Sequence, residues 1–253
     1  MATKLSIIPV RPSKLVGPFQ ERVRRCSDVG MLKTTCLRFA VSTGICAVTY
    51  HHLPPIGAAD PIAFNLICVG FPPELVKRFE SNNPIELDES AKQVLRGAFA
   101  QWWDASESPG RLTNEQQEWL EFAQSKLGYG IHLPVFGPSG RNGYVSLSLG
   151  DSRPEWSDDE LLTLQLCCQT AHLQYCHLLR SYLPKQPKLS PREEQILSWV
   201  AMGKSNGAIA EILNISESSV ITYLERAFQK LGVDSRVSAT LRAYSRGQLR
   251  QME

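Results

Sequence analysis

Two amphipathic helical patterns near the C-terminus are separated by only three residues, and this spacing constrains the fold more than any other feature. The first pattern covers about 206–213 and places Ile209, Ala210 and Leu213 on one face. The connection is Asn214-Ile215-Ser216, and Ser216 is a favourable N-cap. The second pattern repeats Val220, Leu224, Ala227 and Leu231 at spacings of 4, 3 and 4. Two helices joined by so tight a polar turn predict a helix-turn-helix unit.

Further helices flank this pair. Ser190, Pro191 and Glu193 form the N-cap, first turn and capping box of a helix that ends at Gly203. Its apolar stripe is Ile196, Leu197, Val200 and Ala201. A last helix is predicted near 235–246, with Val237, Leu241 and Tyr244 facing inward. The C-terminal part is therefore predicted to be an all-α four-helix domain.

The segment LPKQPKLSP at 183–191 holds three prolines and two lysines, which is typical of a linker. We expect one domain over 1–182, a linker over 183–190, and the helix-turn-helix domain over 191–253. The net charge of the chain is +2. Residues 184–253 hold ten Lys and Arg against seven Asp and Glu, a mild excess that permits nucleic-acid binding without establishing it.

The part before the linker mixes helical and strand patterns. Helices are predicted near 18–42, 72–81, 89–103, 114–127 and 157–182. Strands are predicted at 45–50, 64–70, 129–136 and 142–149, and GPSGR joins the last two as a hairpin. We expect an α+β fold, with an N-terminal α/β/α sandwich around a small antiparallel sheet, followed by the helical domain.

Composition excludes several protein classes. No apolar run is long enough to cross a membrane, and the N-terminus lacks the pattern of a secretory signal, so we expect a cytoplasmic protein. Seven cysteines without a CxxC pair argue against a disulfide framework. No nucleophile, nucleotide-loop or metalloprotease motif occurs, so we expect neither an enzyme nor a cofactor.

The C-terminal stretch resembles the LuxR-type DNA-binding domain. Over about 60 residues, five short motifs stand in the family's order: LSPRE, GKSN, AIAEILNIS, SSV and QKLGV. An ordinary helical bundle would not supply this pattern. The resemblance implies that the helix after Ser216 enters the major groove of duplex DNA. Two positions depart from the family: Ile221 stands where Lys is common, and Tyr223 where His is common.

Positions on the second helix predict outward-facing side chains at Ser218, Ile221, Thr222, Glu225, Arg226 and Gln229. Of these, Arg226 is the expected guanine contact. Lys230 is either a phosphate contact or part of a solvated face. The full predicted DNA-binding set is Lys204, Ser205, Asn206, Ser216, Ser218, Thr222, Arg226, Gln229, Lys230 and Arg236.

The N-terminal part resembles the autoinducer-binding domain of acyl-homoserine-lactone receptors, most clearly over 72–104 and 127–150. The resemblance implies a ligand site formed by Tyr50, Leu75, Phe79, Asp88, Phe99, Trp103 and Tyr129. Leu75 and Phe79 stand where the family has Trp and Tyr, so two hydrogen bonds to a lactone signal are lost, each costing about 1–3 kcal/mol. We therefore expect an orphan receptor for a more apolar ligand, or for none. Asp88 is alternatively a helix N-cap, and Trp102 and Trp103 are alternatively core aromatics.

One group of potential metal ligands stands elsewhere in the sequence. Cys168, His172 and Cys176 lie at i, i+4 and i+8 on the predicted 157–182 helix, although a buried face of small residues explains the same spacing. Separately, His51 and His52 precede LPPIG and are predicted to lie in a loop, and no Ser or Cys nucleophile motif accompanies them.

These features predict a LuxR-type transcription regulator that forms a homodimer on an inverted-repeat DNA site and senses a small molecule or a protein partner. Two alternatives stay open. One is an adaptor that sequesters another regulator by protein contact, with weak DNA binding. The other is a thiol-based redox switch.

Overall fold

The structure is a computed structural model of the 253-residue chain. It describes residues 9–60, 66–71, 73–74, 76–77, 96–97, 99–104, 113–114, 117–118, 121, 127–183 and 187–249. Two compact units emerge: most of residues 1–181 form the first, and residues 182–253 form the second together with 54–61 and 138–141.

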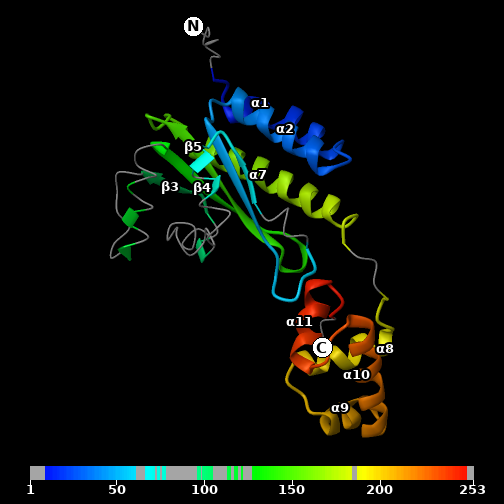
Figure 1. The fold of residues 1–253 in the computed structure, drawn as a ribbon. Helices are drawn as coiled ribbons and strands as arrows, with labels where there is room; N and C mark the ends of the chain where they lie inside the picture. The colour runs from blue at the N-terminus through cyan, green and yellow to red at the C-terminus, as the bar shows by residue number, and fades with distance from the viewer. Residues whose placement is uncertain are drawn as a thin grey trace. The chain divides into compact units, whose positions relative to one another are not determined.

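A five-stranded antiparallel sheet is the centre of the first unit (Figure 1). Its strand order is β2-β1-β5-β4-β3. The strands are β1 (Ala47–Leu53), β2 (Leu66–Val69), β3 (Gln101–Asp104), β4 (Tyr129–Val135) and β5 (Asn142–Gly150). The predicted hairpin is confirmed, because β4 and β5 pair directly around the short 3-10 helix η2 (Pro138–Gly140).

Three helices lie on one face of this sheet (Figure 1). They are α1 (Pro12–Arg24), α2 (Val29–Ser42) and α7 (Asp158–Leu179). The Asp28 side chain accepts from the backbone N–H of Met31 and begins α2. Ser157 and Glu160 form a capping box that begins α7. Helices packed on an antiparallel sheet confirm the α+β prediction, and the predicted helices at 72–81 and 114–127 lie mostly outside the described residues.

Two predictions for the first unit are wrong in detail. The helical pattern over 18–42 is two helices, because the chain turns before the N-cap at Asp28. The pattern at 89–103 does not continue to its end as a helix: residues 101–103 belong to β3, which pairs with β4. Cross-strand hydrogen bonds therefore override the local helical pattern there.

The second unit contains the four predicted helices, α8 (Pro191–Ala201), α9 (Asn206–Leu213), α10 (Glu217–Leu231) and α11 (Arg236–Ser245). Side chains of Ser190, Ser205, Ser216 and Ser235 cap their N-termini. Asn214 (φ 49°) and Gly232 (φ 65°) adopt the left-handed conformation that ends α9 and α10.

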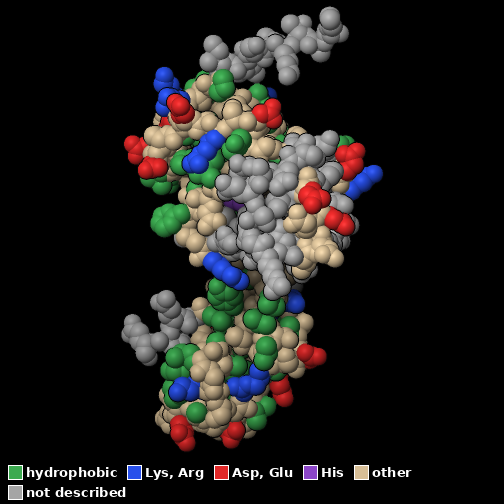
Figure 2. Space-filling model, turned by 90° about the vertical axis from the view of Figure 1, so that its left-hand side faces the viewer, with side chains coloured by type: hydrophobic (Ala, Val, Ile, Leu, Met, Phe, Trp, Pro, Cys, Tyr) green, Lys and Arg blue, Asp and Glu red, His purple; other side chains and the backbone are tan. Residues whose placement is uncertain are grey.

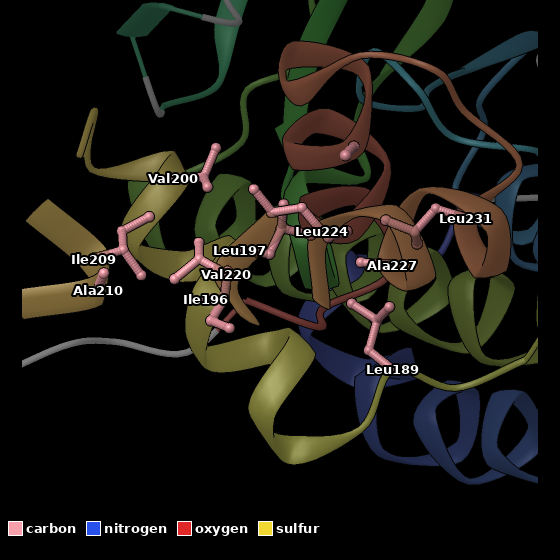
Figure 3. Close-up of a cluster of buried hydrophobic side chains, with 12 residues drawn as sticks. Leu189, Ile196, Leu197, Val200, Ile209, Ala210, Val220, Leu224, Ala227 and Leu231 are labelled. Carbon is pink, nitrogen blue, oxygen red and sulfur yellow. The ribbon is translucent and has the colours of Figure 1, made fainter. Parts of the chain in front are cut away.

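One apolar core holds these helices together (Figure 3). Ile196 and Leu197 of α8, Ile209 of α9, and Val220 and Leu231 of α10 are all 0% exposed. Burying each such side chain stabilises a fold by about 1.5–3 kcal/mol.

The prediction of which α11 side chains face the core is wrong. Val237 is 70% exposed and Tyr244 is 49% exposed, whereas Ala239 and Ala243 are fully buried. The small alanines let α11 approach α8 and α10 closely, which the larger side chains would prevent. Ala201 of α8 is likewise exposed instead of inward. Among the described residues, no helix combines the length and apolar character needed to cross a membrane.

Candidate DNA-binding surface and signal-binding site

The helix-turn-helix is formed by α9 and α10. Behind α10, Val220, Leu224, Ala227 and Leu231 are buried in the core, as predicted. The hydroxyl of Ser216 accepts from the backbone N–H of Ser219 at 3.1 Å and fixes the start of the helix. The orientation of α10 is therefore set by its apolar face and its cap together.

The opposite face of α10 carries the side chains predicted to face outward. Ser218, Ile221, Thr222, Glu225, Arg226 and Gln229 are all exposed. The Arg226 guanidinium lies 5.8 Å from the centre of the Tyr223 ring, a cation–π distance. Tyr223 thus orients Arg226 along the outward face while leaving its N–H groups available.

A second group of predicted DNA-binding residues meets at the start of α9. Arg236 donates from Nη1 to Oδ1 of Asn206 at 2.5 Å and from Nη2 to the backbone carbonyl of Lys204 at 2.7 Å. The hydroxyl of Ser205 accepts from the backbone N–H of Ala208. Lys204, Ser205, Asn206 and Arg236 therefore form one polar surface beside a helix N-terminus, where anions are favoured.

Lys230, predicted as either a phosphate contact or part of a solvated face, lies beside a buried carboxylate. Its Nζ lies 2.7 and 3.0 Å from the two carboxylate oxygens of Glu193. The Glu193 side chain is only 4% exposed and that of Lys230 is 32% exposed. Burial raises the pKa of Glu193, but hydrogen bonds from Lys230 and the Ser190 backbone lower it by more, so the net pKa lies below its ordinary value. Lys230 joins α10 to α8.

Charge on the second unit is mixed. On the face shown in Figure 2, Lys and Arg side chains of this unit stand apart, with Asp and Glu side chains among them. This agrees with the mild basic excess in the sequence. Binding specificity would therefore depend on individual contacts more than on a broad positive field.

The sheet of the first unit has two chemically different faces. Residues opposite one another in paired strands share a face. Val48, Leu147 and Ile131 lie opposite one another and belong to the apolar core under the helices. Thr49, Ser146 and His132 form the neighbouring row and point to the other face, where all three are buried. We call this second surface the polar sheet face.

Four rings cross the polar sheet face from β3 to β1. Trp103 stacks on His132 with ring centres 5.7 Å apart, and His132 meets Tyr144 edge-on at 6.1 Å. Tyr144 stacks on His51 at 4.2 Å and an interplanar angle of 7°. Burial, helped by His132, lowers the pKa of His51 to about 3, so this ring is uncharged at neutral pH. Its Nε2 lies 3.1 Å from the Thr49 hydroxyl.

Of the four rings, Trp103 is the one whose N–H group could donate to a ligand. A side chain on Gly130, the partner of Trp103 in β4, would lie 2.1 Å from the indole ring, so the glycine makes room for it. Within the described part of the chain, the buried Nε1 of Trp103 has no hydrogen-bond partner. A buried donor without a partner is costly, which favours a bound acceptor at this position.

Of the other predicted ligand residues, Tyr50 is separated from Trp103 by the sheet. Tyr50 points to the helical face, where its hydroxyl lies 2.8 Å from Nδ1 of His172. Tyr50 and Trp103 therefore lie on opposite faces of the sheet and cannot line one pocket. Phe99 is 76% exposed and Tyr129 is half-buried. Leu75, Phe79 and Asp88 lie outside the described residues.

The helical side of the sheet contains an apolar pocket. Its cavity volume is about 110 Å³, and its walls come mainly from α2, α7 and the strands. The residues that line it include Leu32, Phe39, Val48, Leu147 and Leu164. Tyr50 and His172 supply polar groups at its edge.

The thiols around this pocket are poor candidates for redox sensing. Burial raises the pKa of Cys36 and of Cys167 to about 12, and raises that of Cys168 well above its ordinary value. Oxidation and disulfide exchange proceed through the thiolate, which such pKa values suppress near neutral pH. This disfavours the redox-switch alternative.

Sequence reasoning missed one residue of a buried cluster. His172 and Cys176 meet His52, which lies in β1 instead of the predicted loop. Cys168 instead packs against the core that contains Leu164. The missed signal was the strand pattern of 45–50, which continues through Leu53.

Comparison with known proteins gives two family matches. The autoinducer-binding domain family matches residues 29–175, and the bacterial regulatory proteins of the luxR family match residues 187–243. The putative HTH-type transcriptional regulator y4qH of Sinorhizobium fredii is 33% identical over 147 residues, which make up 58% of this chain and 45% of that protein. The chain thus spans under half of that relative's length.

Two further relatives match over longer regions. The transcriptional activator protein VanR of Vibrio anguillarum is 26% identical over 182 residues, which cover 70% of this chain and 75% of VanR. The crystal structure of Escherichia coli SdiA has a TM-score of 0.74 and 20% identity, and covers 94% of this chain and 99% of SdiA. This likeness shows a shared fold. Because the autoinducer-binding match alone covers more than half of the chain and the luxR match follows it, the chain belongs to the LuxR family of bacterial transcriptional regulators, with an autoinducer-binding domain ahead of a helix-turn-helix domain.

Proposed function

We propose that the protein binds duplex DNA as a homodimer through α10 and that a small signal molecule bound in the N-terminal domain controls this binding. It works in the cytoplasm by binding DNA and catalyses no reaction. The observation that carries the proposal is α10 itself: its apolar face is buried and its polar face is exposed along the whole helix. A helix so held can enter a major groove without rearranging its core.

Within that arrangement the exposed residues take different roles. Arg226 donates to guanine, with Ser218, Thr222 and Gln229 beside it at base edges. Lys204, Ser205, Asn206 and Arg236 bind backbone phosphates at the start of α9. Ile221 is 43% exposed where relatives commonly carry Lys, so each subunit makes one phosphate contact fewer. The affinity of a single subunit for an isolated half-site is therefore low.

Dimerisation compensates for this weak half-site binding. Leu162, Leu166 and Leu173 of α7 are 58%, 49% and 47% exposed, and their spacing places them on one stripe of the helix. We assign this stripe to the contact between two copies of the chain. A two-fold dimer requires an inverted-repeat site whose half-sites lie about 10–10.5 base pairs apart, or a multiple of that distance.

The signal-binding site is assigned to the polar sheet face. Its rings form a continuous aromatic row, and the buried Nε1 of Trp103 is a donor for one carbonyl or hydroxyl oxygen. The uncharged His51 and the row of Thr49 and Ser146 suit a neutral molecule better than an ion. The ligand class is therefore a small, largely apolar molecule with at least one hydrogen-bond acceptor.

Two experiments test these assignments. Selection from random DNA duplexes by the full chain should enrich an inverted repeat, and enrichment of no motif would contradict the DNA-binding role. Mass spectrometry of small molecules released from the purified protein should show one neutral compound per chain. Trp103→Phe should reduce its occupancy, whereas Trp199→Phe, in the DNA-binding domain, should not.

A further inference from the structure

Three buried residues of the N-terminal domain bring metal-ligating atoms together. His52 comes from β1, and His172 and Cys176 come from consecutive turns of α7. One ligating atom from each lies within 4.8 Å of the other two, and each residue is only 2% exposed. We call these three residues the His-His-Cys cluster. It lies on the helical side of the sheet, away from Trp103.

The distances within the cluster approach those of a metal centre. Sγ of Cys176 lies 3.6 Å from Nε2 of His172. Zinc–sulfur and zinc–nitrogen bonds of about 2.3 and 2.0–2.1 Å in tetrahedral geometry put the two ligand atoms about 3.6 Å apart. His172 and Cys176 therefore already stand at a separation suited to one shared ion. The ligand atom of His52 lies within 4.8 Å of both, so a small rotation of its ring would complete a three-ligand site.

Tyr50 supplies the support that a metal-bound histidine requires. Its hydroxyl lies 2.8 Å from Nδ1 of His172, so that nitrogen can donate and Nε2 is left with its lone pair toward Cys176. Metal-bound histidines in proteins nearly always donate their other ring N–H in this way, which fixes the ring and its tautomer. The same hydroxyl lies 3.4 Å from Nδ1 of His52. Tyr50 is thus a positioning residue for both imidazoles.

We propose that the His-His-Cys cluster binds one zinc-type transition-metal ion through His52, His172 and the thiolate of Cys176. The ligand set selects the metal class, because thiolate and imidazole favour zinc and similar ions over Mg²⁺ and Ca²⁺. Three protein ligands leave a fourth position for water or for an added donor atom. Tyr50, His172 and Tyr175 also line the apolar pocket, so the cluster lies at its wall.

Binding of the ion would join β1 to α7. These two elements are far apart in sequence, and their contacts include ring packing of Tyr50 on Tyr175 and the hydrogen bond between Tyr50 and His172. Because α7 carries the exposed leucine stripe, the ion would stabilise the helix proposed to hold two chains together. This metal site does not depend on the proposed DNA binding, and its test needs no DNA.

The test uses the full chain, purified without chelators in the presence of a non-thiol reductant. Titration with Co²⁺ should give one equivalent bound, with the intense visible bands of tetrahedral Co²⁺ and a near-ultraviolet thiolate charge-transfer band. Zn²⁺ should displace it stoichiometrically, and Mg²⁺ should not. Elemental analysis of protein expressed with added zinc should find about one Zn per chain.

Matched variants separate this site from adventitious binding. Cys176→Ser should abolish the charge-transfer band, and His172→Gln should lower Co²⁺ affinity at least ten-fold. Cys167→Ser, a buried thiol on the same helix, and His177→Gln, an exposed imidazole beside the cluster, should bind as the wild type does. Far-ultraviolet circular dichroism checks that each variant is folded. Absence of uptake by the reduced wild type, or an unchanged spectrum in Cys176→Ser, would overturn the proposal and leave a metal-free hydrogen-bond network.

Discussion

Replacing Lys230 with alanine should destabilise the DNA-binding domain without changing how it contacts DNA. The substitution leaves the Glu193 carboxylate 4% exposed and without its ammonium partner. Breaking a fully buried ion pair costs about 3–5 kcal/mol. Lys230 is 32% exposed, so water can replace part of its role, and the backbone N–H of Ser190 still donates to Glu193 at 2.7 Å. We therefore expect a loss of about 2 kcal/mol, in the range for a hydrogen bond to a charged group.

Hydrogen–deuterium exchange of the full chain measures this loss locally. A cost of about 2 kcal/mol corresponds to a roughly thirty-fold faster exchange of the amides in α8 and α10. The double variant Glu193→Gln with Lys230→Met should recover most of the protection, because no buried charge is left unpaired. Lys204→Ala, at an exposed lysine, is the control and should leave exchange unchanged. Unchanged protection in Lys230→Ala, with a salt slope of DNA binding reduced by about one, would show that Lys230 binds phosphate and that this reasoning is wrong.

Three further predictions concern pH, DNA affinity and assembly. The pKa of Glu193 is lowered in the folded state, so its stabilising contribution is complete above about pH 4.5 and is lost as the pH falls through the folded pKa. Thermal unfolding measured from pH 6 to 3 should show this loss of stability in the wild type and much less of it in Glu193→Gln. Ile221→Lys should strengthen binding to any duplex and steepen the salt slope by about 0.9 per chain in anisotropy titrations, whereas Met202→Lys should change it less. Leu166→Asp should convert dimers to monomers in sedimentation experiments, while Val41→Asp, at an equally exposed residue of α2, should not; a dimeric Leu166→Asp would exclude the α7 stripe as the interface.

The C-terminal domain could be predicted closely because its signals are local. Serine caps, the capping box at Glu193, and the left-handed ends at Asn214 and Gly232 all act within a few residues. The facing of α11 could not be predicted in this way. Its register depends on how closely it packs on α8 and α10, and close packing selects Ala239 and Ala243 over the more apolar Val237.

The N-terminal domain was harder to predict because its contacts are long-range. Strand β3 is only four residues long, and each of its residues pairs with a β4 residue 25 to 31 positions later in the sequence. The separation of Tyr50 from Trp103 follows from strand register, which a spacing argument does not contain. For the same reason the sequence carries no signal for the ion pair of Lys230 with Glu193, 37 residues apart, or for the contact of His52 with His172, although the strand pattern through Leu53 does place His52 in β1.

The most direct test of the central claim is the affinity of Arg226→Ala for the DNA site selected by the wild type. If α10 contacts bases in the major groove, this variant should bind that site about 10–100-fold more weakly in fluorescence anisotropy titrations and lose preference at one base pair of each half-site. Arg24→Ala, which removes the same charge from an exposed site on α1, should bind as the wild type does. Equal affinity and unchanged preference in Arg226→Ala would contradict the proposed use of α10 and favour a regulator that acts by protein contact.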